Sequence, residues 1–252
     1  MNIKKLLAGL TVSLVSVTAT AQMSGYEVYD TSDKMINSSV DRAIYYTNYS
    51  FFGGSTDKDT FLKTADRSKG VVLYAHGCGR NSSWDREIRK FYLELGFNFI
   101  DADFLRRHDS GPSCSLFGNN FVYRTNVYER LKTRELELSA QIRFLKANGF
   151  EKVIAVGHSE GGMVIQMLGA EVSAAVIHSM ACVPTHQQPN PKNKTLRLFS
   201  VNDPVVMPRW GVVMLCDGHD WYKNFTNVLS NVESHAPLAD DNWKTVVRNF
   251  VK

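Results

Sequence analysis

Residues Val153 to Gly162 read Val-Ile-Ala-Val-Gly-His-Ser-Glu-Gly-Gly and constrain the fold more than any other stretch of the chain. Their apolar start is typical of a buried parallel strand, and the apolar run from Met163 is typical of a helix. Between them, Gly157 and Gly161 flank Ser159 as G-x-S-x-G, a pattern that fits a sharp strand-to-helix turn without room for side chains. The pattern predicts a nucleophile elbow with Ser159 as the candidate nucleophile. A glycine-rich turn with an inert serine is the competing interpretation.

The first 21 residues have the three parts of a secretory signal peptide. Two lysines lie near the start, Leu6 to Val17 is largely apolar, and Ala19 to Ala21 are small residues that suit cleavage. The apolar part spans about twelve residues, short of the roughly twenty that cross a bilayer. No later stretch is long or uncharged enough to span a membrane. We therefore expect a soluble secreted or periplasmic protein that loses residues 1–21 and starts at Gln22.

The formal net charge of the chain is small. It is +4 for the whole sequence, and removal of Lys4 and Lys5 with the signal peptide lowers it to +2. A nucleic-acid-binding surface needs a strong excess of basic residues. The charge therefore argues against nucleic acid as a partner, and the sequence leaves the oligomeric state open.

Export changes the interpretation of the four cysteines, Cys78, Cys114, Cys182 and Cys216. An even number of cysteines in an oxidising compartment predicts two disulfides. Three pairings are open. We favour Cys78 with Cys114 and Cys182 with Cys216, because each pair then joins loops that we expect to lie close together. No two cysteines are spaced C-x-x-C, so a metal site is not expected.

Regular alternation of strands and helices from residue 71 onward predicts one α/β domain rather than two. Residues 70–252 would form its core, a mostly parallel central sheet with helices on both faces. Residues 22–69 are more polar, and their alternating stretch from Val40 to Tyr49 predicts antiparallel strands at the sheet edge. We expect core strands at Val71 to Ala75, Phe97 to Phe104, Val153 to His158, Ala174 to Met180, Leu196 to Val201 and Thr226 to Val232, and helices at Trp84 to Leu95, from about 119 to 148, after Ser159, and at Pro237 to Val251.

A serine hydroxyl needs a base to take its proton, and the base needs a carboxylate to hold it in the right tautomer. In a fold with this elbow, the acid and then the histidine come from loops after later strands. Asp203 directly follows one expected strand in Asn202-Asp203-Pro204, and His235 follows the last one. Order and placement predict a triad of Ser159, His235 and Asp203.

Other residues could compete for these roles. His219 lies in a polar cluster with Asp217 and Asp220, but no expected strand holds that cluster in place. His178 lies within a strand, which favours a neutral, hydrogen-bonded core histidine, and His186 lies in a polar loop, which favours exposure to solvent. Asn-Asp-Pro is also a common turn sequence, so a turn role for the acid stays open.

The oxyanion that forms during acyl transfer needs two backbone N–H donors. One comes from the residue after the nucleophile and the other from the loop after an earlier strand. The sequence assigns these donors to Glu160 and Cys78. We expect the Glu160 side chain to line the mouth of the site, with a helix-start acid favoured by the helix dipole as the alternative.

A resemblance to a known family rests on Val71 to Gly79, Asp101 to Asp103, Cys114, Gly157 to Gly162, Asn202-Asp203 and His235. Together these segments resemble the α/β-hydrolase superfamily, and most closely its dienelactone-hydrolase-like branch. The resemblance covers residues 70 to 252 and implies a single-domain α/β-hydrolase fold with the triad and oxyanion donors assigned above. The namesakes of the branch use a cysteine nucleophile where this chain has Ser159, so it resembles the serine esterases of the branch more.

The expected strands that end near Met180 and start near Leu196 are only about fifteen residues apart, too few for a helical lid domain. An open cleft favours esters with short acyl groups, or esters on a sugar or polymer outside the cell. We expect hydrolysis through an acyl-enzyme with no cofactor and no metal. A peptidase or amidase on the same triad is the alternative enzyme, and a non-catalytic exported binding protein is the alternative of another class.

Overall fold

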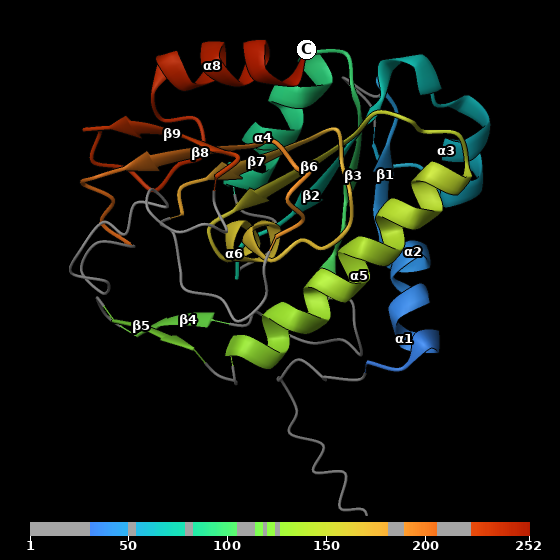
Figure 1. The fold of residues 1–252 in the computed structure, drawn as a ribbon, viewed down its shortest axis with the longest axis horizontal. Helices are drawn as coiled ribbons and strands as arrows, with labels where there is room; N and C mark the ends of the chain where they lie inside the picture. Colours follow the sequence, from blue (N-terminus) through green and yellow to red (C-terminus); the bar gives the residue numbers. More distant parts are fainter. Residues whose placement is uncertain are drawn as a thin grey trace, which may run out of the picture.

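The computed structural model describes residues 31–49, 54–78, 83–104, 114–117, 120–123, 127–180, 189–205 and 223–252. Figure 1 shows how their helices and strands are arranged. In chain order, the elements are α1 Asp33–Asn37, α2 Ser39–Arg42, β1 Ile44–Tyr46, α3 Lys58–Thr64, a 3-10 turn Arg67–Lys69, β2 Val71–Ala75, α4 Ser83–Glu94, β3 Asn98–Asp101, β4 Cys114–Phe117, β5 Asn120–Tyr123, α5 Val127–Ala147, β6 Val153–His158, α6 Glu160–Gln166, β7 Ala174–His178, β8 Thr195–Ser200, β9 Phe225–Ser230 and α8 Asp241–Val251.

A seven-stranded sheet runs through the middle of the molecule in the order β1-β3-β2-β6-β7-β8-β9. Every neighbouring pair is parallel except β1 with β3. Parallel strands need crossover connections. Within the described residues, α4 lies between β2 and β3, α5 between β3 and β6, and α6 between β6 and β7. The expected mostly parallel α/β sheet is confirmed.

Alternate residues of each central strand enter two separate apolar cores. On β2, Val71, Leu73 and Ala75 pack into one core, with side chains of α5 and α6. Val72 and Tyr74 pack into the other, with side chains of α4 and α8. Figure 1 shows these helices on the two faces of the sheet. Both faces of the strands are therefore buried, which explains why the sequence reads as continuous apolar runs.

The described part of the segment 22–69 contains more helix than expected. Only Ile44 to Tyr46 form a strand, β1, at the edge of the sheet, whereas the antiparallel strands were expected from residue 40 onward. Residues 39–42 form α2 instead, so the first part of the alternating stretch is helical. Ser32 and Asp57 cap the neighbouring helices α1 and α3, because their side-chain oxygens accept backbone N–H groups at the helix starts.

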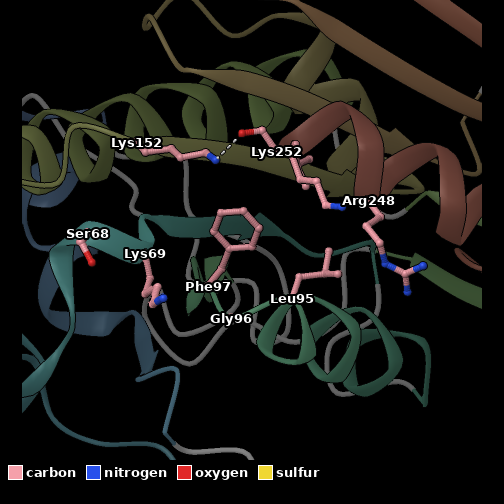
Figure 2. A pocket seen from close by; sticks show the side chains of 9 residues that line it. Ser68, Lys69, Leu95, Gly96, Phe97, Lys152, Arg248 and Lys252 are labelled. Atoms are coloured by element: carbon pink, nitrogen blue, oxygen red, sulfur yellow. Dashed lines mark hydrogen bonds between the residues drawn. The ribbon is translucent and has the colours of Figure 1, made fainter.

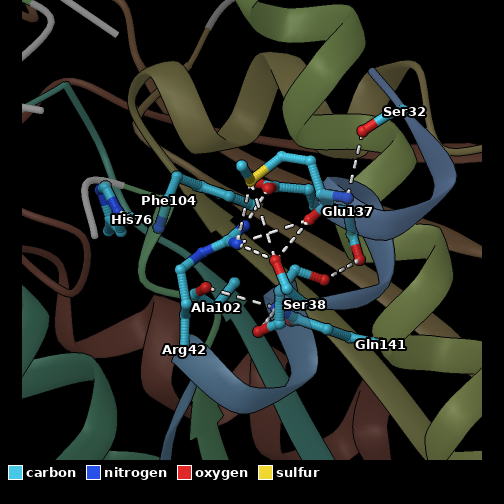
Figure 3. Close-up of polar contacts among 10 residues, drawn as sticks. Ser32, Ser38, Arg42, His76, Ala102, Phe104, Glu137 and Gln141 are labelled. Atoms are coloured by element: carbon cyan, nitrogen blue, oxygen red, sulfur yellow. Dashed lines mark hydrogen bonds and ion pairs between the residues drawn. The ribbon is translucent and has the colours of Figure 1, made fainter. Parts of the chain in front are cut away.

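The short helix α2 is tied to α5 by buried polar contacts (Figure 3). Arg42 forms an ion pair with Glu137, whose side chain is almost fully buried. Gln141 Nε2 donates to the carbonyl of Ser39 at 3.0 Å and to that of Ala102, directly after β3, at 3.3 Å. The N-terminal helices are thereby joined to the helix that covers one face of the sheet.

The hairpin of β4 and β5 was not expected from the sequence. Cys114 pairs with Tyr123 and Phe117 with Asn120, where a loop and the start of a long helix were expected. Helix α5 instead begins at Val127. Within the described ranges, no helix is both long and apolar enough to cross a membrane.

Candidate active site

Ser159 lies at the turn between β6 and α6, with φ 54° and ψ −122°. Such a positive φ is uncommon for a residue with a side chain and is found mainly where the surroundings hold the backbone in place. Here the Ser159 amide donates to the carbonyl of His178 at 3.0 Å, and its carbonyl accepts from the amide of Gly162 at 2.8 Å. The serine is partly buried at the carboxyl edge of the sheet. This is the geometry of a nucleophile elbow.

The flanking glycines are required by close backbone contacts. A Cβ on Gly157 would lie 2.4 Å from the carbonyl oxygen of Gly161, and a Cβ on Gly161 would lie 1.9 Å from that of Ala75. Real Cβ atoms do not approach so closely. The elbow therefore presses directly on the end of β2, and only glycine fits at these two positions.

Asp203 and His235 form a buried pair. His235 Nδ1 lies 2.7 Å from Asp203 Oδ2, and both side chains are almost fully buried. An ionised carboxylate only accepts hydrogen bonds, so Nδ1 carries the proton and Nε2 is left free to accept one. Asp203 Oδ1 also accepts from the amide of Val205 at 2.8 Å, so this aspartate holds its own turn as well as the histidine.

The loop that carries His235 is held next to the elbow. His158, the residue before Ser159, donates from Nε2 to the carbonyl of His235 at 3.0 Å, and the two rings lie 5.1 Å apart. Ser179 Oγ donates to the carbonyl of Ala236 at 3.1 Å. The structure thus brings the Asp203–His235 pair to the end of the sheet where Ser159 lies.

Trp84 and His158 are site residues that the sequence analysis did not identify. The Trp84 ring, on the first turn of α4, packs edge-on at 5.3 Å from the ring of His158 and at 5.4 Å from that of His235. A signal was available for His158, because it is the residue between glycine and serine in the elbow. Trp84 has no such signal, since the sequence marks it only as the first residue of an expected helix, Trp84 to Leu95.

Two histidines beside the elbow are held neutral. Burial, with His235 nearby, lowers the pKa of His158 well below its usual value. Burial also lowers the pKa of His178 to about 4, although a 2.7 Å hydrogen bond from its Nδ1 to the carbonyl of Pro237 partly opposes the shift. His178 is therefore the buried, hydrogen-bonded core histidine that the sequence analysis expected.

The low pKa of His178 makes stability depend on pH. The pKa of His178 is 6.5 ordinarily and about 4 in the folded protein. At a pH between these two pKa values, the unfolded chain therefore binds more protons than the folded one. The stability due to neutral His178 is fully present above about pH 6.5 and is lost as the pH falls toward about 4, by about 3 kcal/mol in total. We expect the free energy of unfolding in urea, measured between pH 7 and 4, to fall less steeply in His178→Gln than in wild type.

The comparison of slopes isolates the histidine, because carboxylates that titrate over the same range contribute to both proteins alike. Any hydrogen bond lost in His178→Gln changes the stability at every pH and leaves the slope unaffected. Equal slopes in the two proteins would show that this histidine is not held neutral.

The loop after β2 lies against the elbow. A Cβ on Gly77 would lie 3.4 Å from Cβ of Ser159, and Cys78 follows directly. His76 fixes this loop, because its Nε2 accepts the amide of Phe104 at 3.1 Å and its Nδ1 donates to the carbonyl of Gly77 at 2.6 Å. The two expected oxyanion donors thus belong to backbone segments that touch each other.

Cys78 is bonded in a disulfide. Its partner lies outside the described side chains, so the pairing of Cys78 with Cys114 and that of Cys182 with Cys216 stay predictions. Residues 1–21, the competing histidines at 186 and 219, and residues 181–188 of the loop between β7 and β8, where no lid is expected, also lie outside the described residues.

The side chain of Glu160 does not line the mouth of the site, and that expectation was wrong. Its side chain is 1% exposed and lies beneath the elbow against α5. Arg130 binds it with two hydrogen bonds, Nε to Oε1 at 3.0 Å and Nη2 to Oε2 at 2.7 Å. Arg134 Nη1 lies 2.7 Å from Oε1. As the first residue of α6, Glu160 points back into the protein, where two guanidinium groups neutralise it.

A cavity of about 250 Å³ lies at the opposite, amino end of the sheet (Figure 2). Lys152 directly precedes β6 there, and Lys69 lies two residues before β2. Lys152 Nζ donates to the carbonyl of Lys252 at 3.1 Å. None of the expected triad residues lines this cavity. It is therefore separate from the site around Ser159.

No protein-family model matches the sequence, and no curated protein matches it. Solved structures do match the fold. The esterase Pf2001 of Pyrococcus furiosus aligns with a TM-score of 0.51 at 17% identity, over 74% of this chain and 84% of that one. TT1662 of Thermus thermophilus aligns with a TM-score of 0.50 at 14% identity, over 73% and 90%. A dienelactone hydrolase of Anabaena variabilis aligns with a TM-score of 0.44 at 16% identity, over 72% and 85%.

At such low identity, the first two likenesses bear on the fold alone. Both alignments cover most of each chain, as expected for a shared overall fold. The expected single-domain α/β-hydrolase fold is confirmed.

Proposed function

We propose that this protein is an exported serine hydrolase that cleaves carboxylic esters through an acyl-enzyme. The observation that carries the proposal is the buried 2.7 Å contact between His235 and Asp203, held beside an elbow that presents Ser159. A carboxylate, an imidazole and a strained serine at one sheet edge are the components of a nucleophilic acyl-transfer site. The name of the Pyrococcus furiosus esterase, a protein of similar fold, agrees with this reaction class.

In the proposed reaction, Ser159 Oγ attacks the ester carbonyl carbon while His235 Nε2 takes the hydroxyl proton. Asp203 stabilises the imidazolium that forms, and the N–H groups of Glu160 and Cys78 donate to the oxyanion. Collapse of the tetrahedral intermediate breaks the ester C–O bond, and His235 returns its proton to the departing alcohol. Water then attacks the acyl-serine in the same way and releases the carboxylic acid.

The proposed substrate is an ester with a short acyl group, or one on a sugar or polymer outside the cell. The support is the short connection between β7 and β8, which has little room for a lid that would cover a long acyl chain. Export is proposed from the charged, apolar and small-residue order of residues 1–21. Oxidised cysteines suit an exported protein, and the disulfide at Cys78 is consistent with export.

A comparison of leaving groups tests the function. We expect the mature chain to hydrolyse a short-chain nitrophenyl ester and to leave an aminoacyl nitroanilide largely intact, since the amine is the poorer leaving group. A fluorophosphonate should label one residue, and mass spectrometry should locate the label on Ser159 because only an activated serine reacts.

Each outcome separates one class of function from another. Faster cleavage of the anilide than of the ester would favour a peptidase or amidase on the same triad. Absence of both activities and of labelling would favour a non-catalytic binding protein. A label on another serine would contradict the proposed nucleophile.

A further inference from the structure

The buried charges beneath the elbow form a fixed clamp on Glu160. Arg130 and Arg134 lie one turn apart on α5, and both guanidinium groups reach the same carboxylate. All three side chains are at most 1% exposed. A bidentate arginine–carboxylate contact fixes orientation as well as distance. The residue whose N–H is the first proposed oxyanion donor is thus anchored through its side chain.

The second proposed donor is reached from the same clamp. The Arg134 guanidinium lies 5.1 Å from the centre of the Phe104 ring. Phe104 packs against His76, 5.3 Å between ring centres, and its amide donates to His76 Nε2. His76 lies beside Phe104 in Figure 3 and holds the carbonyl of Gly77, the residue before Cys78. A continuous set of contacts therefore runs from Arg134 to both donor segments.

We propose that Arg130 and Arg134 are positioning residues that hold the two halves of the oxyanion hole in register. The inference rests on the proposed serine hydrolase. Neither arginine is assigned contact with substrate, since both side chains are buried under the elbow. Arg130 fixes Glu160, and Arg134 joins Glu160 to the loop that carries Cys78. The two donors follow separate strands and need a contact that fixes their relative position, because a displacement of a fraction of an ångström weakens an oxyanion contact.

The charges suit this role better than a role in stability. Buried ion pairs contribute little net stability compared with apolar residues of the same size, because desolvation offsets their attraction. They do impose a defined geometry, which an apolar contact leaves looser. Oxyanion contacts are made mainly in the transition state. Loss of the contact that fixes the two donor segments therefore lowers kcat and leaves KM nearly unchanged.

The test uses Arg134→Met and Arg134→Lys, with Arg143→Met as the matched control on the exposed side of the same helix. We expect Arg134→Met to lower kcat for a short nitrophenyl ester by about 10- to 100-fold, with KM within about twofold of wild type, since a displaced donor costs less than a deleted one. Arg134→Lys should recover part of the loss, because it restores the charge, and Arg143→Met should behave as wild type.

A second readout separates positioning from general damage. An alkylboronic acid forms a tetrahedral adduct with the active serine, and one of its oxygens occupies the oxyanion hole. Its inhibition constant should rise in Arg134→Met by the same factor as kcat falls. The inhibition constant of the product carboxylic acid, which forms no such adduct, should stay unchanged.

The outcomes distinguish this inference from the function on which it rests. A folded Arg134→Met with wild-type kcat and boronate affinity would overturn the inference alone. A wild-type protein that hydrolyses no ester would overturn both. If Arg134→Met does not fold, Phe104→Leu decides, because it keeps an apolar side chain but removes the aromatic contact between Arg134 and His76. Unchanged kcat in folded Phe104→Leu would then overturn the inference.

Discussion

Replacement of Ser159 by alanine is expected to lower kcat for a short-chain ester by about 10⁵- to 10⁶-fold. The hydroxyl is the atom that forms the acyl-enzyme, and no neighbouring group in the described site is placed to replace it. The Asp203–His235 pair stays in place, because its 2.7 Å contact does not involve the serine. Initial rates with a nitrophenyl ester at high enzyme concentration measure the residual activity, and fluorophosphonate labelling of the variant should disappear.

The variant should remain folded, so a lost activity reports on chemistry. Alanine fills less space than serine, and the amide of residue 159 keeps its hydrogen bond to the carbonyl of His178. The control is Ser173→Ala, an exposed serine that precedes β7 at the other end of the sheet, which should retain wild-type kcat. Ester hydrolysis that persists at more than about 1% in Ser159→Ala would remove the proposed mechanism, since loss of a triad member costs far more.

The central sheet and the elbow could be predicted because their signals are local. Strands buried on both faces require continuous apolar runs such as Val71 to Ala75, and such runs can be recognised in the sequence. The glycines at 157 and 161 are dictated by backbone contacts within one strand-to-helix unit. The contact between Asp203 and His235 could be expected from their order along the chain, because the connections of such a sheet bring together residues that lie far apart in sequence.

The clamp on Glu160 could not be predicted, because its signal is not local. Helix α5 carries buried Arg130, Arg134 and Glu137, and polar residues at these positions read as a solvated face. Their burial depends on acids from other elements: Glu160 begins α6, and Glu137 meets Arg42 of α2. The sequence does place arginines at i and i+4 on this helix, but it does not indicate which carboxylate they face. The side chain of an acid directly after a nucleophile can therefore point to the mouth of the site or into the protein, and only packing decides between the two.

The clearest test of the elbow as a packed unit is Gly161→Ala, which we expect to lower the free energy of unfolding by more than about 4 kcal/mol or to prevent folding. Helix propensity acts in the opposite direction, since alanine is favoured over glycine in a helix by about 1 kcal/mol. The clash dominates, because the new Cβ would lie 1.9 Å from the carbonyl oxygen of Ala75 and 2.7 Å from that of His76. Both are backbone atoms of the β2 end, and they have no rotamer by which to move away.

The matched control is Gly54→Ala, because a Cβ at residue 54 would meet no atom within 4 Å. Its free energy of unfolding in urea should lie within about 0.5 kcal/mol of wild type. A Gly161→Ala protein with wild-type stability would mean that α6 does not press on the end of β2. The two oxyanion segments would then not touch, and Arg134 would have no contact between them to stabilise. The stability of this one variant therefore bears on the elbow and on the clamp together.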